Sequence, residues 1–495
     1  MSRTENIIRT NGPMLSGKLC QLLMEKYNIS SSTARKEISR ATFPVQKNRK
    51  LPFDKNQVFV YLNSQYNTQE YCVNLYESIK NSSSGLSSIV YALENSFGIM
   101  KKDLLPIYSS SPIENTLGHR VFSQNIKTLI ENGLITEKED YYELSSKHSG
   151  IIPNLNCANG LAIVNKMLVK DYIAWSQKLN LMAFNAAKAH PEAPNFAHFA
   201  WLASSPSYFY PLSIGKNNGF TVVDVLWKIN TDINDVKFFV DKVNTIKSFK
   251  NLRRVAPILL VNSLTTDALN YLKEKQILFF ITSNLFDKEY SNTLNNIFTV
   301  LKNPVSIIKN KPECIEDVLD SIKKFDGMFN NVMGALFESL VGLFYVEAGD
   351  ELIGINLEIK NDKGTKYEMD VLTRKDDTIT ITECKALRSQ LDTDYLQPWL
   401  DTRVQCFNSW VQQNYPNHNI TYEIWALSGF TDNAKDLLNN YRIANADDYT
   451  LEFRDKSEIR EYAKTRGGTK FNKQLKEHYK DYGNKTKKSR TNKSK

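Results

Sequence analysis

The chain has 495 residues, with 63 Lys and Arg against 54 Asp and Glu, a formal net charge of +9, and 41% hydrophobic residues. This length favours about three domains, and the composition is that of an ordinary globular protein, which excludes wholesale disorder. The charge is uneven, because residues 454–495 hold 15 Lys and Arg against 5 Asp and Glu. The rest of the chain is nearly neutral, so the overall charge does not make the whole chain a nucleic-acid binder.

Several classes of protein are disfavoured by the sequence. It has no apolar run of about 18 residues that could span a membrane, and its N-terminal MSRTENIIRTNG lacks the apolar core of a signal peptide. The six Cys form no CxxC pair and the six His form no HExxH motif. We therefore expect a cytoplasmic protein that has no membrane partner and no disulfide framework.

Residues 1–80 are predicted to form a helix-turn-helix DNA-binding module. Over 14–41, apolar residues recur at helical spacing, stop near Asn28 and resume after Ser30–Ser32, which are good N-cap residues. The second helix would expose Arg35, Lys36 and Arg40, where a recognition helix carries the cations that contact DNA. The open alternative is a plain helical hairpin with a solvated basic face.

Residues 81–170 are predicted to form a winged-helix domain. Helices are expected near 86–97, 99–108 and 119–132, and two short strands should follow. Winged-helix domains bind proteins as well as DNA, so this pattern does not specify a ligand.

Two α/β segments are expected next, at 171–310 and 320–452. The strands of the first are continuously apolar, as in a sheet covered by helices on both faces. In the first segment we expect strands at 220–229, 255–263 and 276–283 and helices at 232–249 and 265–275. In the second we expect strands at 351–360, 365–374, 378–387 and 420–428, a turn at Lys363-Gly364, and helices at 326–349, 392–413 and 431–440.

The two segments share a faint internal repeat. Each has the order strand, long helix, strand, short helix, and the short helices open with the similar sequences TDA and TDNA. Aligning Lys228 with Lys385 places Leu226 where the second copy has Glu383. The first copy would then be a degenerate fold without the catalytic acid. Chance similarity between two α/β units is the alternative.

The candidate catalytic residues are Glu338, Asp370, Glu383 and Lys385. Asp370 lies on one strand of a probable hairpin, and Glu383 and Lys385 lie on the next. Strand alternation places Glu383 and Lys385 on one face, and neighbouring strands are about 4.8 Å apart, so Asp370 can meet Glu383. Paired carboxylates offer the oxygen ligands that Mg²⁺ prefers, and a Lys beside them can orient water for attack on a phosphodiester. The alternative is an exposed Glu–Lys pair on a surface hairpin.

This block of about 130 residues resembles the PD-(D/E)xK nuclease superfamily, which has the restriction-endonuclease-like fold. The resemblance implies a central mixed sheet flanked by helices, with Asp370 as the first acid, Glu383 as the second, Lys385 as the lysine, and Glu338 on the preceding helix. It implies that Asp370, Glu383 and Glu338 hold Mg²⁺, for which Mn²⁺ should substitute. Met369 stands where the motif's name has Pro. Gln397 and Arg403 are candidate phosphate contacts on the following helix.

These features together predict a Mg²⁺-dependent DNA endonuclease, of the restriction or antiphage-defence type by analogy of fold. The alternative is a DNA-binding regulator or assembly subunit with a silent nuclease fold; an RNA substrate is a further possibility. A homodimer is possible. The P-loop-like GPMLSGKL has Leu19 where Mg²⁺ needs a hydroxyl, so an ATP-driven step would require a separate ATPase or regulatory subunit. Residues 453–495 should form a basic, partly disordered tail that is attracted to phosphate.

Overall fold

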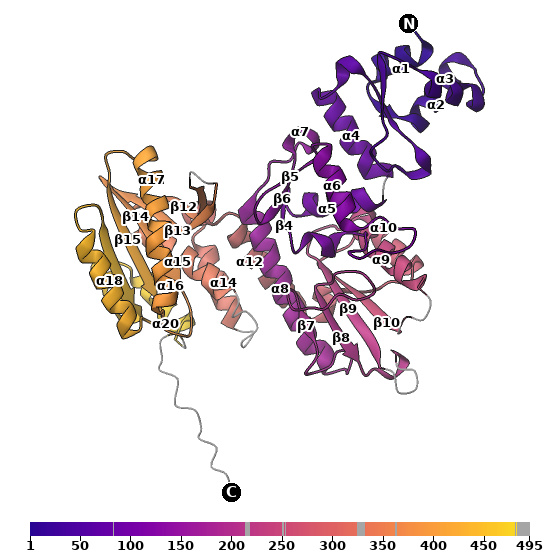
Figure 1. The fold of residues 1–495 in the computed structure, drawn as a ribbon. Coiled ribbons are helices and arrows are strands. Elements are labelled where there is room, and N and C mark those ends of the chain that lie inside the picture. The colour runs from indigo at the N-terminus through magenta and orange to yellow at the C-terminus, as the bar shows by residue number, and fades with distance from the viewer. Residues whose placement is uncertain are drawn as a thin grey trace. The chain divides into compact units, whose positions relative to one another are not determined.

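A computed structural model describes residues 1–82, 84–212, 218–249, 252, 254–323, 332–361, 364–480 and 482 (Figure 1). The chain divides into two compact units, Met1–Ser291 and Asn292–Lys495. Each unit contains one mixed five-stranded sheet, and the first also contains two three-stranded sheets. Among the described residues, no helix is both long enough and apolar enough to cross a membrane.

The first module contains the two helices predicted over 14–41. Ser30 caps the second of them by accepting a hydrogen bond from the Thr33 amide, and Leu23 and Ile38 are buried in the core. Antiparallel strands pair in the order β1-β3-β2 beside these helices. The elements are α1 (Arg3–Asn11), β1 (Met14–Leu15), α2 (Ser16–Tyr27), α3 (Ser31–Arg40), β2 (Val45–Asn48), η1 (Asp54–Asn56), β3 (Phe59–Leu62) and η2 (Asn63–Gln65).

The second module repeats this strand pattern, in the order β4-β6-β5. The helix predicted over 99–108 is wrong in its first part, because Ile99–Lys101 pairs with Tyr141–Glu143 as a strand. A short 3-10 turn then starts at Leu105, and Pro106 lies at its beginning. The elements are α4 (Gln69–Ser82), α5 (Ser84–Asn95), β4 (Ile99–Lys101), η3 (Leu105–Tyr108), α6 (Phe122–Glu131), β5 (Ile135–Glu137), β6 (Tyr141–Leu144) and α7 (Ser146–Ser149).

The middle sheet has the order β11-β10-β9-β8-β7, and α8 packs on β9. Helix α8 passes unbroken through position 170, where the sequence suggested a boundary. The elements are α8 (Leu155–Gln177), β7 (Lys188–Ala189), β8 (Ala203–Ser207), η4 (Tyr210–Leu212), β9 (Gly219–Leu226), α9 (Ile233–Lys247), β10 (Val255–Val261), α10 (Thr266–Glu274), β11 (Leu278–Ile281) and α11 (Thr282–Leu285). Helix α12 (Lys288–Lys302) leads into the second unit.

The second unit is built on the sheet β12-β13-β14-β15-β16. Alternate residues of β15 face opposite sides: Tyr422 and Ile424 join the core under α16–α18, while Trp425 packs against Phe344 of α15. The elements are α13 (Pro304–Asn310), α14 (Glu313–Lys323), α15 (Met333–Glu347), β12 (Glu351–Lys360), β13 (Lys366–Lys375), β14 (Thr378–Lys385), α16 (Thr393–Pro398), η5 (Trp399–Arg403), α17 (Val404–Asn414), β15 (Asn419–Ala426), α18 (Asp432–Ala444), β16 (Thr450–Asp455), α19 (Lys456–Thr465) and α20 (Thr469–His478). Positions 326–331 of the predicted first helix and Lys363 of the predicted turn lie outside the described residues.

The two five-stranded sheets share one topology. In each, the first three strands in chain order pair antiparallel, and the last two join them in parallel. The short helices start alike, since Thr265 caps α10 at the Ala268 amide and Thr431 caps α18 at the Ala434 amide. The predicted repeat of elements is therefore observed as a repeat of fold.

The predicted residue alignment within this repeat needs correction. Lys385 is paired within β14, opposite Ala426, whereas Lys228 lies beyond the end of β9 at Leu226. When the sheets are matched through the two Thr caps and their parallel register, Val223 takes the place of Glu383. In this register the residue equivalent to Glu383 is Val223 and not Leu226.

The basic C-terminal segment is more ordered than its charge suggested. Strand β16 ends at Asp455, and two helices follow it. Phe471, Leu475 and Tyr479 are buried, and the Tyr479 hydroxyl donates to the Met333 carbonyl at 2.9 Å. Their spacing of four residues is a helix signal that the high charge obscured. Residues 483–495, the other part of the predicted tail, lie outside the described residues.

A buried ion pair joins the middle sheet to its long helix. Lys242 Nζ lies 2.7 Å from Asp224 Oδ2 and 3.8 Å from the centre of the Trp201 ring, and both charged side chains are fully buried. Lys242→Met should therefore destabilise the first unit by about 3–5 kcal/mol, because it leaves a buried charge without its partner. Urea unfolding followed by tryptophan fluorescence measures this loss.

The double variant Asp224→Leu/Lys242→Met removes both charges and should recover most of the lost free energy of unfolding. A double variant as unstable as Lys242→Met would show that the pair itself is not the source of the loss.

Candidate active site

Asp370, Glu383 and Lys385 meet where β13 and β14 separate. The antiparallel ladder between these strands runs to Val371 opposite Thr382, so Asp370 and Glu383 occupy the next position. The Asp370 carboxylate reaches across the gap and accepts a hydrogen bond from the Cys384 amide at 2.8 Å. The strand pairing thus brings together the three residues that the sequence singled out.

Lys385 lies between the two carboxylates. Its Nζ is 2.9 Å from Asp370 Oδ2 and 2.8 Å from Glu383 Oε1. Asp370 is 7% exposed and Glu383 1% exposed. Two carboxylates so deeply buried need a cation beside them, because desolvation of unpaired charges is costly. Lys385 is thus the one buried cation shared by these two carboxylates.

The two acids respond differently to this environment. Burial and the charge of Glu383 raise the pKa of Asp370 to about 6. Burial would also raise the pKa of Glu383, but Lys385 and a hydrogen bond from Tyr395 outweigh it and hold that pKa below its usual value. Burial would lower the pKa of Lys385, but the adjacent carboxylates raise it instead. Glu383 and Lys385 are therefore the firmly charged members of the group.

Glu338 approaches from α15, on the opposite face of the sheet from α16. Burial and the charge of Asp370 raise the pKa of Glu338 well above its usual range, and a hydrogen bond with Asn356 opposes this rise. Asn356 is on β12, at the register position facing Asp370, and has a left-handed backbone with φ of 54°. The sequence analysis missed Asn356, although a lone Asn inside an apolar strand was a usable signal.

The helical segment after β14 supplies two more groups. The Tyr395 hydroxyl donates to Glu383 Oε1 at 2.6 Å, and Arg403 Nη1 lies 3.6 Å from the same oxygen. A π-helical turn, Trp399–Arg403, ends at this arginine, and such turns often occur at functional sites. Arg403, a predicted phosphate contact, is thus beside the acids, while Tyr395 was not predicted.

Gln397, the other predicted phosphate contact, makes its hydrogen bonds elsewhere. Its Nε2 donates to Asp401 Oδ2 at 2.8 Å and to the Tyr441 hydroxyl at 3.2 Å. Tyr441 belongs to α18, so these bonds tie α16 to α18. The structure therefore gives Gln397 a place in helix packing.

The predicted DNA contacts lie in the other unit. Arg35, Lys36 and Arg40 are all exposed on α3, while Ala34 and Ile38 of the same helix are buried. One face of α3 is therefore apolar and packed, and its cations are in solvent. This arrangement is what a basic docking helix requires, and a solvated helix face would look the same.

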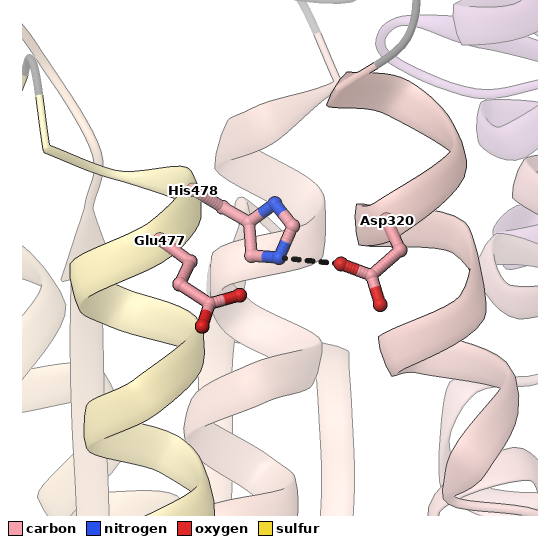
Figure 2. Close-up of side chains that lie close together, drawn as sticks. All are labelled: Asp320, Glu477 and His478. Atoms are coloured by element: carbon pink, nitrogen blue, oxygen red, sulfur yellow. Dashed lines mark ion pairs between the residues drawn. The ribbon is translucent and has the colours of Figure 1, made fainter.

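A tighter group of possible metal ligands lies elsewhere in the second unit. Among the described residues, Asp320, Glu477 and His478 are the one group of three acidic, His or Cys side chains whose ligand atoms all lie within 4.8 Å of one another. Figure 2 shows Asp320 of α14 facing His478 of α20, with His478 Nε2 3.4 Å from Asp320 Oδ1. The Asp320 side chain is 62% exposed, and an ion pair between two helices accounts for the contact.

Comparison of this chain with protein-family models, curated proteins and solved structures found no match. The chemistry of the site is therefore argued from its own residues. Those residues are three carboxylates, a lysine held between two of them, and Asn356, Tyr395 and Arg403 around them.

The charge balance at Lys385 predicts a pH-dependent loss of stability in Lys385→Met. Without the ammonium, the folded-state pKa of Asp370 rises further above its unfolded value, and the pKa of Glu383 is no longer held below its own. Stability then falls as pH rises above about 4, so the variant should lose about 3 kcal/mol at pH 8 and much less at pH 5. Thermal unfolding of the full chain at both pH values measures this difference.

Lys375→Met is the matched control, because Lys375 is half-exposed at the end of β13 and lies 3.8 Å from Asp350. Its loss should be at most about 1 kcal/mol. Equal destabilisation of Lys385→Met at both pH values would contradict the charge-balance account.

Proposed function

We propose that this chain is a Mg²⁺-dependent DNA endonuclease of the PD-(D/E)xK type. The observation that carries the proposal is the placement of Lys385 within 2.9 Å of Asp370 and 2.8 Å of Glu383, at the end of the central strand of a mixed sheet. A purely structural ion pair needs one acid and one base, whereas this site holds an additional buried acid. Restriction or antiphage defence is the setting that the domain order suggests by analogy.

The donor set suits a hard divalent cation. Asp370, Glu383 and Glu338 offer carboxylate oxygens and Asn356 an amide oxygen, which are the ligand types that Mg²⁺ and Mn²⁺ accept. Ionised Asp370 is the form that binds such a cation. When bound, the cation would polarise a phosphoryl oxygen and acidify a water ligand.

The chain's own residues would orient the reactants. Lys385, strongly charged and held by two carboxylates, can position the attacking water and face the charge that develops on phosphorus. Tyr395 fixes one oxygen of Glu383. The Arg403 side chain is 38% exposed, so it can contact Glu383 and still bind a phosphate oxygen of the substrate.

The N-terminal module supports DNA as the substrate. Its order of helix, strand, two helices and two strands, with β3 central, supports the winged-helix assignment that we propose for it. Arg35, Lys36 and Arg40 lie on the helix that would enter the major groove. In the second module, α6 occupies this position with Lys127 as its one cation, so the first module is the better DNA-binding candidate.

Cleavage is tested with conservative variants in the acid cluster, by which we mean Asp370, Glu383, Glu338 and Lys385. Asp370→Asn, Glu383→Gln and Lys385→Met should each lower the rate of Mg²⁺-dependent DNA cutting by about 10²–10³-fold or more, because each removes a charge that acts on the reacting phosphate. The measurement is single-turnover cleavage of labelled duplex, with single-stranded DNA and RNA run in parallel.

Asp376→Asn in the exposed turn after β13 is the control and should cut at the wild-type rate. An unchanged cleavage rate in the Asp370→Asn/Glu383→Gln double variant would contradict the proposal. Duplex binding with no cutting by wild type in Mg²⁺ or Mn²⁺ would favour the alternative, a DNA-binding subunit with a silent nuclease fold.

DNA binding is tested through its salt dependence. Arg35→Ala, Lys36→Ala and Arg40→Ala should each weaken duplex binding and reduce the slope of log K against log salt by about 1, the effect of one lost phosphate contact. Lys127→Ala is the matched control, because Lys127 is 77% exposed on the equivalent helix. A slope that stays at the wild-type value in all three variants would refute the assignment of α3.

A further inference from the structure

Asn356 has an unusual backbone for its place in the fold. Its φ is 54°, and among the described residues it is the one non-glycine residue inside a β-strand with a left-handed backbone. Residues with a Cβ incur a steric penalty in this region, although asparagine tolerates it better than most. Strand β12 keeps its register on both sides of this residue, and Asn356 stands opposite Asp370. The distortion is therefore confined to the position that faces the acid cluster.

Strand β12 changes faces at Asn356. Ile355 packs against Gly342 of α15, on one side of the sheet. Leu357, two positions later, packs against the core under α16–α18, on the other side. Residues two apart in a regular strand lie on the same face. The left-handed residue between them accounts for the change.

Strand β13 changes faces at the opposite residue, Asp370. Met369 belongs to the core under α16–α18. Val371 pairs with Thr382, whose hydroxyl oxygen lies 3.0 Å from that of Tyr345 on α15, so Val371 lies on the α15 face. Both strands thus switch sides at one point in the sheet, and Asp370 lies at the switch.

This switch is where acids from the two sides of the sheet meet. Glu383 is held from the α16 side by Tyr395, whereas Glu338 comes from α15 on the other side. The Asn356 side chain is hydrogen-bonded to Glu338, and the charge of Asp370 also acts on Glu338. An ionised carboxylate only accepts hydrogen bonds, so the amide of Asn356 donates to it. Such a bond favours the ionised form, in which a carboxylate can bind a cation.

We propose that Asn356 is a positioning residue, whose left-handed backbone aims its amide at Glu338 and holds that carboxylate at the cation site beside Asp370. The inference rests on the proposed function, because it gives Glu338 its place among the ligands. Strained backbone is retained where the surrounding structure and the function require it. A glycine at this position would relieve the strain but would leave Glu338 without the group that orients it.

The test is a double-variant cycle on Mn²⁺ affinity, measured by electron paramagnetic resonance with the full-length protein. Asn356→Gly should weaken Mn²⁺ binding by about tenfold, because Glu338 loses its orienting partner. In the Glu338→Gln background the same change should alter the affinity by less than about twofold, because no carboxylate is left to orient. A residue that only supports the fold would weaken binding equally in both backgrounds, and that result would overturn the proposal.

Thermal unfolding tests the strained backbone separately. Asn356→Gly should melt within about 2 °C of wild type, because glycine adopts a positive φ without steric cost. Asn356→Ala loses the same hydrogen bond but keeps a Cβ, so it should melt about 2–4 °C below the glycine variant. Equal melting temperatures of the two variants would contradict the strain at this position.

Asn28→Gly is the matched control. Asn28 is an exposed asparagine at the end of α2 with a φ of 48°, so this variant makes the same change at another left-handed position. It should bind Mn²⁺ as wild type does.

The same titrations separate this inference from the proposed function. Wild-type protein that binds no Mn²⁺ would overturn both. Wild-type binding that Asp370→Asn/Glu383→Gln weakens and Asn356→Gly leaves unchanged would overturn the role of Asn356 alone.

Discussion

The ammonium of Lys385 between two buried carboxylates is the constraint around which the second unit is arranged. Asp370 and Glu383 come from antiparallel neighbours, so their meeting requires the register that pairs Val371 with Thr382. Burying two acids also requires a permanent cation on the same strand face, and alternation supplies it two residues later.

Much of this site could be predicted from the sequence because strand geometry is regular. Period-two alternation and hairpin pairing were enough to bring Asp370, Glu383 and Lys385 together. Asn356 and Tyr395 were missed, because a left-handed residue on a neighbouring strand and a helical hydroxyl reach the site through tertiary packing. Gln397 was predicted as a phosphate contact, yet its bonds to Asp401 and Tyr441 depend on where α18 packs. Likewise, charge in residues 454–480 concealed the helical spacing of Phe471, Leu475 and Tyr479.

The internal repeat also could be predicted only in part, because its residue alignment depends on tertiary structure. The order of helices and strands could be predicted from the sequence. The residue alignment was wrong by three positions, from Leu226 to Val223, because only the pairing of strands determines which residues are equivalent. With that register known, the middle sheet has Val223 where the other has Glu383 and instead buries Asp224 with Lys242.

The central claim is that a divalent cation binds at Asp370 and Glu383. Electron paramagnetic resonance titration with Mn²⁺ measures this without any substrate. Our account predicts a site in wild type that Asp370→Asn/Glu383→Gln weakens by at least about tenfold, while Asp320→Asn leaves it unchanged. Binding that survives the double variant and is lost in Asp320→Asn would place the metal at the group in Figure 2 and contradict the account.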